Sequence, residues 1–477
     1  STVSKNSLKR SLLQLECHFT WTLLKEDVDL DNLEKRIDNQ TEFFIKNNVS
    51  NYNLLAYVCH LKNLNEEALR NLQKAEEEIK KNHPDEIARR SLVTWGNYAW
   101  IYYHMEKYEE AHTYVSKVEN SCKKLSSTDE WKSKLPEVCA EEGWALLMFG
   151  RKYYERAKNC FENALKNDLN NPEWNAAYAI ATYRLEELSY RECEDVSSAL
   201  NILQRAVELN PTDTFIMALL ALKLQNLNRV NEGERYIEEA MQKTPDLPYL
   251  LRYAAKFYRR KGEMDKALEI LKKALTVTPD SAFLHHQLGL CYRAQLFQLK
   301  RATRYPSQKQ VKQLTTLSIF HFKTATVEKK DFFSAFINLA DMYNQDKRYE
   351  EAEETFQKAI QISNLFDDDK QEFYYSYGNF QRFHRKSESE AIKCYIKGLK
   401  IETDSYGRKK CINALKKLLE LRIRRGAEDA TDFGTLGFIH NLNGEKHEAI
   451  ECYEKALALC PENEDYLSAL CELRLSI

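Results

Sequence analysis

Hydrophobic residues recur along this chain at intervals of three and four, as they do on the buried face of an amphipathic helix. The segments EALRNLQKAEEEIKK (67–81) and EAEETFQKAIQI (351–362) show this spacing plainly. Only 13 Gly and 9 Pro occur in 477 residues, which leaves little material for β-turns. We therefore expect an all-α protein.

A longer period organises these helices. Pro211, Pro245 and Pro279 stand 34 residues apart, and the segments between them share one pattern of small and large apolar residues. In the segment that ends at Pro279, the pattern consists of Ala255, Tyr258, Gly262, Ala267, Leu271 and Ala274. This is the signature of the tetratricopeptide helix–turn–helix, in which small residues let paired helices approach each other. The sequence therefore predicts a right-handed tetratricopeptide superhelix.

The same frame recurs from Leu55 to Pro461, and two segments interrupt it, at 183–199 and 293–314. A single repeat cannot bury its apolar face alone, so the repeats must stack, and the insertions are expected to form loops or helix extensions. We expect three parts: N-terminal and central repeats over 1–245, pivot repeats with a long helical extension over 246–330, and C-terminal repeats with a basic patch over 331–477.

The composition of the chain indicates the cellular compartment in which it functions. The 12 cysteines are scattered without a C-x-x-C pair, which argues against a zinc site and against a disulfide framework. No run of 18 uncharged apolar residues occurs, and the first residues lack the apolar core of a secretory signal. We expect a cytoplasmic protein with reduced cysteines and no membrane partner.

Net charge is −2, yet basic residues gather locally. Offsets of three and four place one basic and aromatic set on a single helix face, which lines the concave groove of such a superhelix: Tyr249, Arg252, Lys256, Arg259 and Arg260, followed in the next repeat by Phe283, His286 and Arg293. Such a groove suits phosphates and stacked bases, but a peptide clamp or a merely solvated surface fits the same pattern. A second basic stretch, 408–425, contains one acid and is either a solvated face or a patch that tracks a nucleic-acid backbone.

Signatures of catalysis are missing from the sequence. It contains no G-x-x-x-x-G-K-[ST] loop, no G-x-G-x-x-G, no nucleophile elbow and no H-E-x-x-H. The adjacent pair His285–His286 would point about 100° apart on a helix and cannot act as one site. We expect a binding protein and not an enzyme.

Longer strings resemble the interferon-induced proteins with tetratricopeptide repeats. They span the chain and include LECHFTW (15–21), YNLLAYVCHLK (52–62), RSLVTWGNYAWIYYHM (90–105), RYAAKFYRRKG (252–262) and LHHQLGLCYRAQ (284–295). The last residues, LCELRLSI, look most like the family's fifth member. The resemblance implies a cytosolic antiviral effector that captures the 5′ end of single-stranded RNA, either triphosphorylated or capped without 2′-O-methylation, and blocks its translation.

Other functions remain open beside this one. Most tetratricopeptide proteins are peptide-binding scaffolds that act through protein partners, and a family member could also act only by assembling with its relatives. The resemblance implies RNA and related family members as partners, with no DNA. It implies no resident cofactor, although a divalent ion at the RNA phosphates is compatible with it.

Capture of RNA requires the superhelix to close into a tunnel, and the resemblance implies a site for the RNA 5′ end within it. Its residues would bind the bridging phosphates through Arg36 and Gln40, and the cap guanine through Trp144, Glu173 and Ile180. The first nucleotide would meet Tyr154, Arg184 and Phe215. Further phosphates and sugars would lie along a wall formed by Tyr249, Arg252, Tyr253, Arg259, His286 and Gln287. For Trp144 the alternative is plain core packing, because it occupies a packing position of its repeat.

Departures from the family pattern affect this site. Met148 stands where the family has a phosphate-binding Lys, and the lost contact is worth on the order of 1–3 kcal/mol. Asp213 and Phe215 stand in place of Asn and Tyr, and Asn32 replaces an acid that helps hold a metal at the triphosphate in the fifth member. We expect these changes to weaken triphosphate binding more than RNA binding as such.

Overall fold

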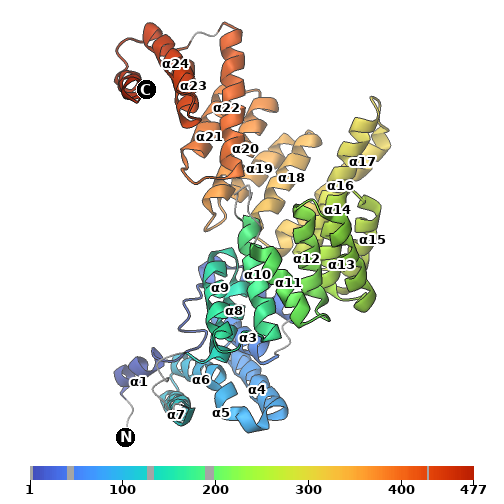
Figure 1. The fold of residues 1–477 in the computed structure, drawn as a ribbon, viewed down its shortest axis with the longest axis vertical. Helices are drawn as coiled ribbons and strands as arrows, with labels where there is room; N and C mark the ends of the chain where they lie inside the picture. The colour runs from blue at the N-terminus through green and yellow to red at the C-terminus, as the bar shows by residue number, and fades with distance from the viewer. Residues whose placement is uncertain (1–3, 40–47, 126–133, 189–197, 427–428, 477) are drawn as a thin grey trace. The chain divides into compact units, whose positions relative to one another are not determined.

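The computed structural model describes residues 4–39, 48–125, 134–188, 198–426 and 429–476 (Figure 1). Over these ranges the chain forms α-helices and a few short 3-10 helices, without a strand, and a longer segment (13–29) joins the first two α-helices. The chain folds into two compact units, Ser1–Phe332 and Phe333–Ile477. The predicted all-α repeat fold is confirmed in both of them.

The first unit holds most of the repeats. Its helices are α1 (Lys5–Leu12), α2 (Leu30–Asn39), α3 (Asn48–Leu61), α4 (Asn65–Asn82), α5 (Ile87–Arg90), α6 (Leu92–His104), α7 (Tyr108–Leu125), α8 (Pro136–Phe149), α9 (Tyr154–Leu165), α10 (Pro172–Leu188), α11 (Ser198–Leu209), α12 (Thr214–Asn226), α13 (Val230–Lys243), α14 (Pro248–Lys261), α15 (Met264–Val277), α16 (Ala282–Ala302) and α17 (Gln308–Glu328).

The second unit continues the repeat. Its helices are α18 (Phe333–Gln345), α19 (Tyr349–Ile360), α20 (Asp367–Phe383), α21 (Glu388–Lys400), α22 (Tyr406–Arg424), α23 (Ala430–Leu442), α24 (Lys446–Leu459) and α25 (Glu464–Leu475). The predicted basic stretch lies on α22, where Lys410 pairs with Glu372 at 2.9 Å and Arg422 pairs with Asp432 at 2.7 Å. Neighbouring acids therefore neutralise part of this stretch.

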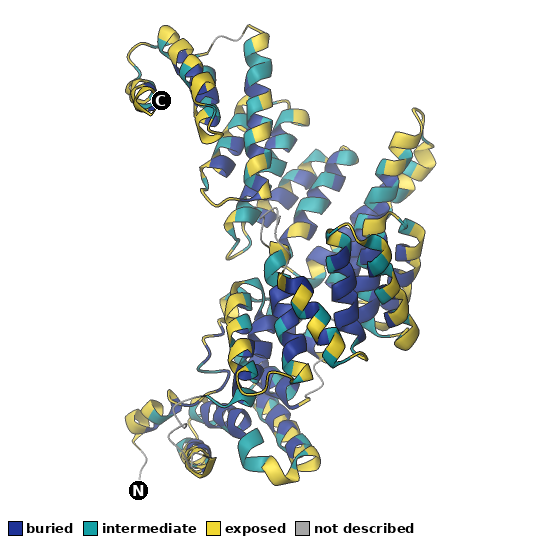
Figure 2. Cartoon of the chain, viewed as in Figure 1, coloured by how far each residue is buried: buried dark blue, intermediate teal, exposed yellow. Residues whose placement is uncertain are grey.

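Helix pairing follows the small-and-large pattern of the sequence. A Cβ atom at Gly143 would lie 2.7 Å from the ring of Phe161, so only glycine lets α8 and α9 approach this closely. Pro248 begins α14 and Gly262 ends it with a φ of +93°, the left-handed conformation that glycine adopts without strain. The buried residues form stripes along the paired helices, with exposed residues on their outer faces (Figure 2).

The two insertions differ in what the structure describes. The segment 293–314 extends α16 and α17 to 21 residues each, compared with 14 in α14 and α15. The expected helix extension is therefore confirmed. Of the insertion at 183–199, residues 189–197 lie outside the described ranges.

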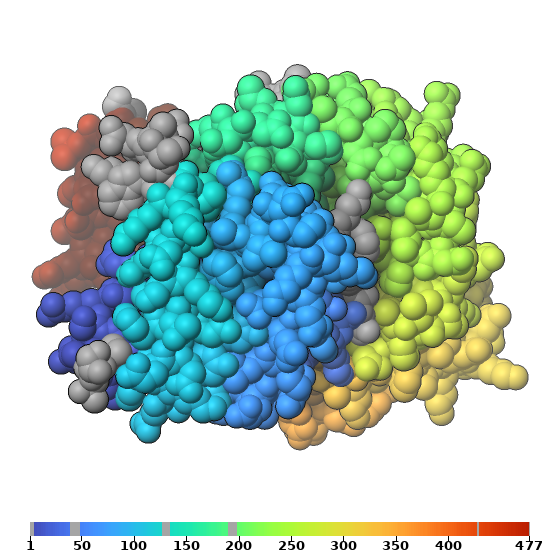
Figure 3. Space-filling view, turned by 90° about the horizontal axis from the view of Figure 1, so that it is seen from below, coloured from blue at the N-terminus to red at the C-terminus, as the bar shows by residue number. Residues whose placement is uncertain are grey.

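Contacts of α2 close the first unit on itself. The Asn32 side-chain amide donates to the backbone carbonyl of Glu328 at 3.2 Å, and the Lys35 ammonium lies 2.7 Å from the Glu328 carboxylate. The backbone N–H of Lys330 donates to the Asp29 carboxylate at 3.1 Å. The start of the unit thus meets its end, and in Figure 3 a dark-blue patch of the N-terminal segment lies between the light-blue and the yellow-green helices. This closure agrees with the enclosed tunnel that the family resemblance implies.

Hydropathy gives no sign of a membrane span. Among the described residues, none of the helices combines the length and the apolar character that crossing a bilayer requires.

Candidate functional site

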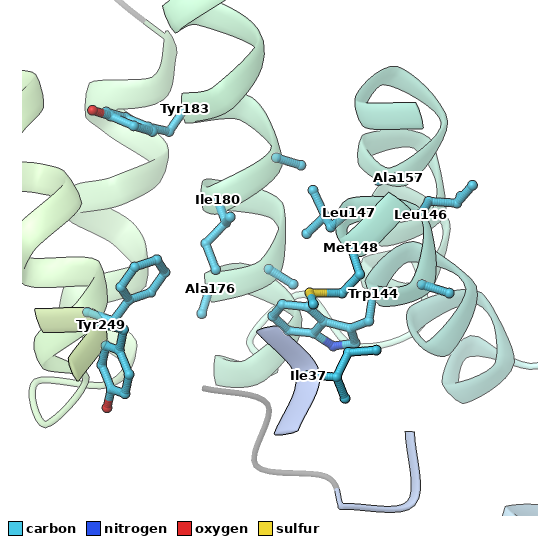
Figure 4. Packing of buried hydrophobic residues seen from close by; sticks show 14 of the residues in the cluster. Ile37, Trp144, Leu146, Leu147, Met148, Ala157, Ala176, Ile180, Tyr183 and Tyr249 are labelled. Atoms are coloured by element: carbon cyan, nitrogen blue, oxygen red, sulfur yellow. The ribbon is translucent and has the colours of Figure 1, made fainter. Parts of the chain in front are cut away.

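Helix α2 brings Arg36 into contact with α8. The Arg36 guanidinium donates through Nη2 to the backbone carbonyl of Met148 at 3.2 Å. Figure 4 shows Ile37 of α2 beside Trp144 and Met148 of α8. Gln40, the expected partner of Arg36, lies outside the described residues. Helix α2 therefore lies against the part of α8 that carries Trp144 and Met148, although the sequence separates the two helices by almost 100 residues.

Trp144 is both a core residue and the wall of a cavity. Its side chain is 6% exposed, and its ring meets that of Phe161 edge-on at 5.4 Å. It also lines a cavity of about 1110 Å³, together with the exposed Glu173 at the start of α10. Ile180, one of the residues expected to contact the guanine, is 2% exposed and lies in the same hydrophobic cluster. Trp144 is therefore a core residue that also reaches the cavity wall, and its stacking on a cap guanine stays a prediction.

A buried carboxyl group in this cavity was missed by the sequence reasoning. Glu141 lies one helical turn before Trp144 on α8 and lines the same cavity. Burial raises the pKa of Glu141 to about 7, and the side-chain amide of Asn53 donates to it at 2.7 Å. Its three-residue spacing from Trp144 was the available signal, but many surface carboxylates share that spacing.

Arg184 and Tyr154, both assigned to the first nucleotide by the family resemblance, lie in contact with each other. The Arg184 guanidinium carbon lies 5.5 Å from the centroid of the Tyr154 ring, within the range of a cation–π contact. Tyr154 begins α9, and Arg184 lies one turn before the end of α10. The two residues therefore present a charge and a ring at one place.

An aromatic cluster joins α12 and α14. The Phe215 ring lies 5.6 Å from that of Tyr249, edge-on, and 5.2 Å from that of Tyr253. The three side chains are 4% to 8% exposed. The nearby Asp213 caps α12, because its carboxylate accepts a hydrogen bond from the Ile216 N–H at 3.2 Å. Asp213 therefore stabilises the start of α12, but Asn would cap the helix equally well, so this role does not explain the added charge.

Basic and polar residues of α14 and α16 pair with one another. The Arg252 guanidinium carbon lies 3.6 Å from the centroid of the Phe283 ring, and Arg259 Nε donates to Gln287 Oε1 at 2.9 Å. The His286 ring packs against the Phe332 ring, with 4.7 Å between the ring centroids. Burial, together with the charge of Arg259, lowers the pKa of His286 to about 3, so this imidazole is neutral. The expected wall is thus assembled from hydrogen-bonded and stacked side chains.

An acid also lies in this basic wall, and the sequence reasoning missed it. Glu187 of α10 lies 3.6 Å from the Lys256 ammonium and 3.5 Å from the Arg260 guanidinium. Burial, followed by repulsion from Arg260, lowers the pKa of Lys256 to about 8. Glu187 lies within the insertion at 183–199, where the repeat frame gives no position from which to predict the direction of its side chain.

Two residues that depart from the family pattern, Met148 and Asn32, have structural roles in this unit. Met148 is 3% exposed and lies beside Trp144 (Figure 4), so its thioether fills space in the core. Asn32 is 5% exposed and donates to the last helix of the unit, as described above. Among the residues that the structure describes, no three His, Cys, Asp or Glu side chains are grouped so as to hold a metal ion.

Comparisons with known proteins place the chain in a family. Models described as tetratricopeptide repeat match residues 254–283, 333–364 and 433–463. Human protein IFIT1 homolog B is 49% identical over 460 residues, covering 95% of this chain and 97% of that protein. The human antiviral innate immune response effector IFIT1 is 47% identical over 465 residues, covering 96% and 97%. The chain belongs to the interferon-induced proteins with tetratricopeptide repeats. Human interferon-induced protein with tetratricopeptide repeats 2 is a more distant relative, 40% identical over 461 residues, which cover 95% of this chain and 96% of that protein.

Solved structures of this family share the fold. The human IFIT1 dimer with m7Gppp-AAAA superimposes with a TM-score of 0.87 at 47% identity, covering 95% of this chain and 99% of that one. The human IFIT1 dimer with PPP-AAAA superimposes with a TM-score of 0.85 at 46% identity, with the same coverage. The expected family membership is confirmed, while the likeness to the fifth member stays a prediction.

Proposed function

We propose that this protein captures the 5′ end of single-stranded RNA in its first unit, recognising a triphosphate or a cap without 2′-O-methylation. It acts in the cytoplasm as an antiviral effector that withholds the bound RNA from translation. It works by binding alone, without catalysis and without a resident cofactor. Relatives whose structures hold capped and triphosphate RNA, with high identity over nearly the whole chain, support this function.

One observation carries the proposal. Arg36 bonds to the backbone carbonyl of Met148, so its guanidinium meets α8 one helical turn beyond Trp144, whose ring lines the cavity. A cap presents its parts in this order, a guanine followed by a chain of phosphates. The indole would stack on the base, and the guanidinium would take the phosphates with charge-assisted hydrogen bonds.

The rest of the site would hold the strand behind its end. Arg184 and Arg252 supply positive charge over the rings of Tyr154 and Phe283. Arg259, which donates to the side-chain amide of Gln287, supplies a third guanidinium. Closure of the unit through α2 would shield a bound strand from water, and electrostatic contacts with phosphate are stronger where water is excluded. Dimers among the solved relatives support related family members as further partners.

The test compares one short RNA with four different 5′ ends: triphosphate, cap, 2′-O-methylated cap and hydroxyl. We expect the first two to bind at least tenfold more tightly than the hydroxyl-ended strand, because a hydroxyl end offers neither terminal phosphates to Arg36 nor a guanine to Trp144. With about five phosphates engaged, log affinity should fall with log salt at a slope of about −3.5. A flat salt response and equal binding of all four strands would instead favour a peptide-binding scaffold.

A further inference from the structure

The α16–α17 hairpin carries a concentration of positive charge that the 5′-end site does not use. Between Asp280 and Glu328 the sequence contains no acidic residue. The same stretch holds seven basic side chains: Arg293, Lys300, Arg301, Arg304, Lys309, Lys312 and Lys323. The whole chain has a net charge of −2, so this hairpin is a local exception.

The outer part of the hairpin is ordered helix without a core. The buried residues closest to the tip are Leu296 on α16 and Thr315 on α17, and no residue from 297 to 314 is buried. The hairpin extends beyond the neighbouring helices of its unit, with a largely exposed tip (Figures 1 and 2). Burial of apolar surface therefore does not explain why the two helices continue this far.

Buried contacts hold the base of the hairpin in place. The Ser318 hydroxyl donates to the backbone carbonyl of Gly289 at 2.9 Å, and the Nδ1 atoms of His285 and His321 lie 3.0 Å apart. A Cβ atom at Gly289 would lie 2.6 Å from the ring of Phe322, so the helices pack in close contact. The tip is thus carried on a rigid support.

One helix face connects the tip to the 5′-end site. Residues seven apart lie on one face of a helix, and on α16 this series runs from His286 through Arg293 to Lys300. Successive members are about 10 Å apart along the axis, and Arg301, near the end of α16, lies about 21 Å beyond Gln287. Basic charge therefore continues along the helix that carries two residues of the proposed site.

Aromatic rings lie among these charges. Tyr305 at the tip is 82% exposed and Phe320 on α17 is 58% exposed. The Arg304 guanidinium carbon lies 5.8 Å from the Tyr305 ring, and that of Arg293 lies 5.0 Å from the Phe297 ring. Exposed rings between basic side chains suit single-stranded nucleic acid, whose phosphates attract the charges and whose bases stack on the rings. An acidic protein surface would use the charges but not the rings.

We propose that the α16–α17 hairpin is a second RNA contact, which binds the phosphate backbone of the strand after it leaves the 5′-end site. This inference rests on the proposed function, because the bound 5′ end delivers the strand to α16. It predicts that affinity grows with RNA length until the strand reaches the tip.

The test uses the full chain and two triphosphate RNAs, a pentanucleotide and a strand of about thirty nucleotides. One variant replaces the four tip cations with glutamine: Arg301→Gln, Arg304→Gln, Lys309→Gln and Lys312→Gln. A control variant removes the same charge from exposed positions of other helices and turns: Lys80→Gln, Lys81→Gln, Lys107→Gln and Lys166→Gln. None of these side chains is buried, so melting temperatures should match that of the unchanged protein.

We expect the tip variant to bind the long strand at least tenfold more weakly and to lower its salt slope by up to about 2.8, for four contacts at about 0.7 each. Pentanucleotide binding and the control variant should change less than twofold. Tyr305→Ala, which leaves the charge intact, should weaken the long strand by about fivefold or more through lost stacking.

The outcomes separate this inference from the proposed function. Unchanged long-strand affinity and salt slope in the tip variant would overturn the hairpin contact while leaving the 5′-end site in place. If hydroxyl-ended and triphosphate strands bound equally, and the tip variant weakened both, the hairpin contact would stand and the 5′-end site would fail. An equal loss in the control variant would overturn the inference, because bulk charge would then explain the effect.

Discussion

Replacing Trp144 with alanine tests the cap interpretation most directly. If the indole stacks on the cap guanine, Trp144→Ala removes a contact that a triphosphate end does not make. Stacking of a base on an aromatic ring is worth about 1–3 kcal/mol, so capped RNA should lose roughly 5- to 150-fold in affinity. Triphosphate RNA of the same sequence should lose less than threefold.

The structure also predicts that the Trp144→Ala variant loses stability. Trp144 is 6% exposed and packs against Phe161, so its truncation leaves a cavity that should destabilise the fold by about 3–5 kcal/mol. Binding must therefore be measured well below the melting temperature of the variant. Trp144→Phe keeps an aromatic face at lower cost and should recover part of the cap affinity.

Trp100→Ala is the matched control. Trp100 is 8% exposed, lies in α6 of the same unit and donates to the backbone carbonyl of Leu12 at 3.2 Å. Its loss should lower the melting temperature without changing the ratio of cap to triphosphate affinity. Fluorescence anisotropy with both RNAs gives that ratio. Equal losses of both RNAs in Trp144→Ala, with the fold intact, would show that Trp144 is only a core residue and would refute the cap interpretation.

Three more predictions concern closure, charge and pH. Asp29→Ala removes the carboxylate that accepts from the Lys330 N–H, so RNA should dissociate several-fold faster from a less securely closed unit, as stopped-flow release would show. Glu187→Gln removes the acid 3.6 Å from Lys256, so RNA should bind more tightly while the melting temperature falls, and unchanged affinity would place this acid away from the strand. Burial lowers the pKa of His18 from 6.5 to about 3, so the unfolded chain takes up this proton first and stability should fall as pH drops from about 6.5 towards 3. His18→Gln should flatten that part of the pH profile in urea melts, and an unaltered profile would exclude His18 as its source.

Local pattern was enough to predict the repeat architecture. Helix pairing depends on small residues facing large ones within about 34 residues, and Gly143 against Phe161 is one such contact. The insertion at 293–314 was predicted to be a loop or a helix extension, because the repeat frame shows which residues exceed the length of one repeat. Rings and charges one or two turns apart, such as Arg252 and Arg259, could be placed on one face for the same reason.

The sequence by itself therefore determined the helices, their pairing and the chemical character of the groove, since all three depend on residues close together along the chain. Only the tertiary structure decided which distant residues meet. Arg36 reaches the carbonyl of Met148 across 112 positions, and Asn32 reaches Glu328 across 296. These contacts depend on small rotations that add up over many stacked repeats, and no local pattern encodes their sum. For the same reason, the acid Glu187 in the basic wall and the closure through α2 emerged only when the repeats were assembled.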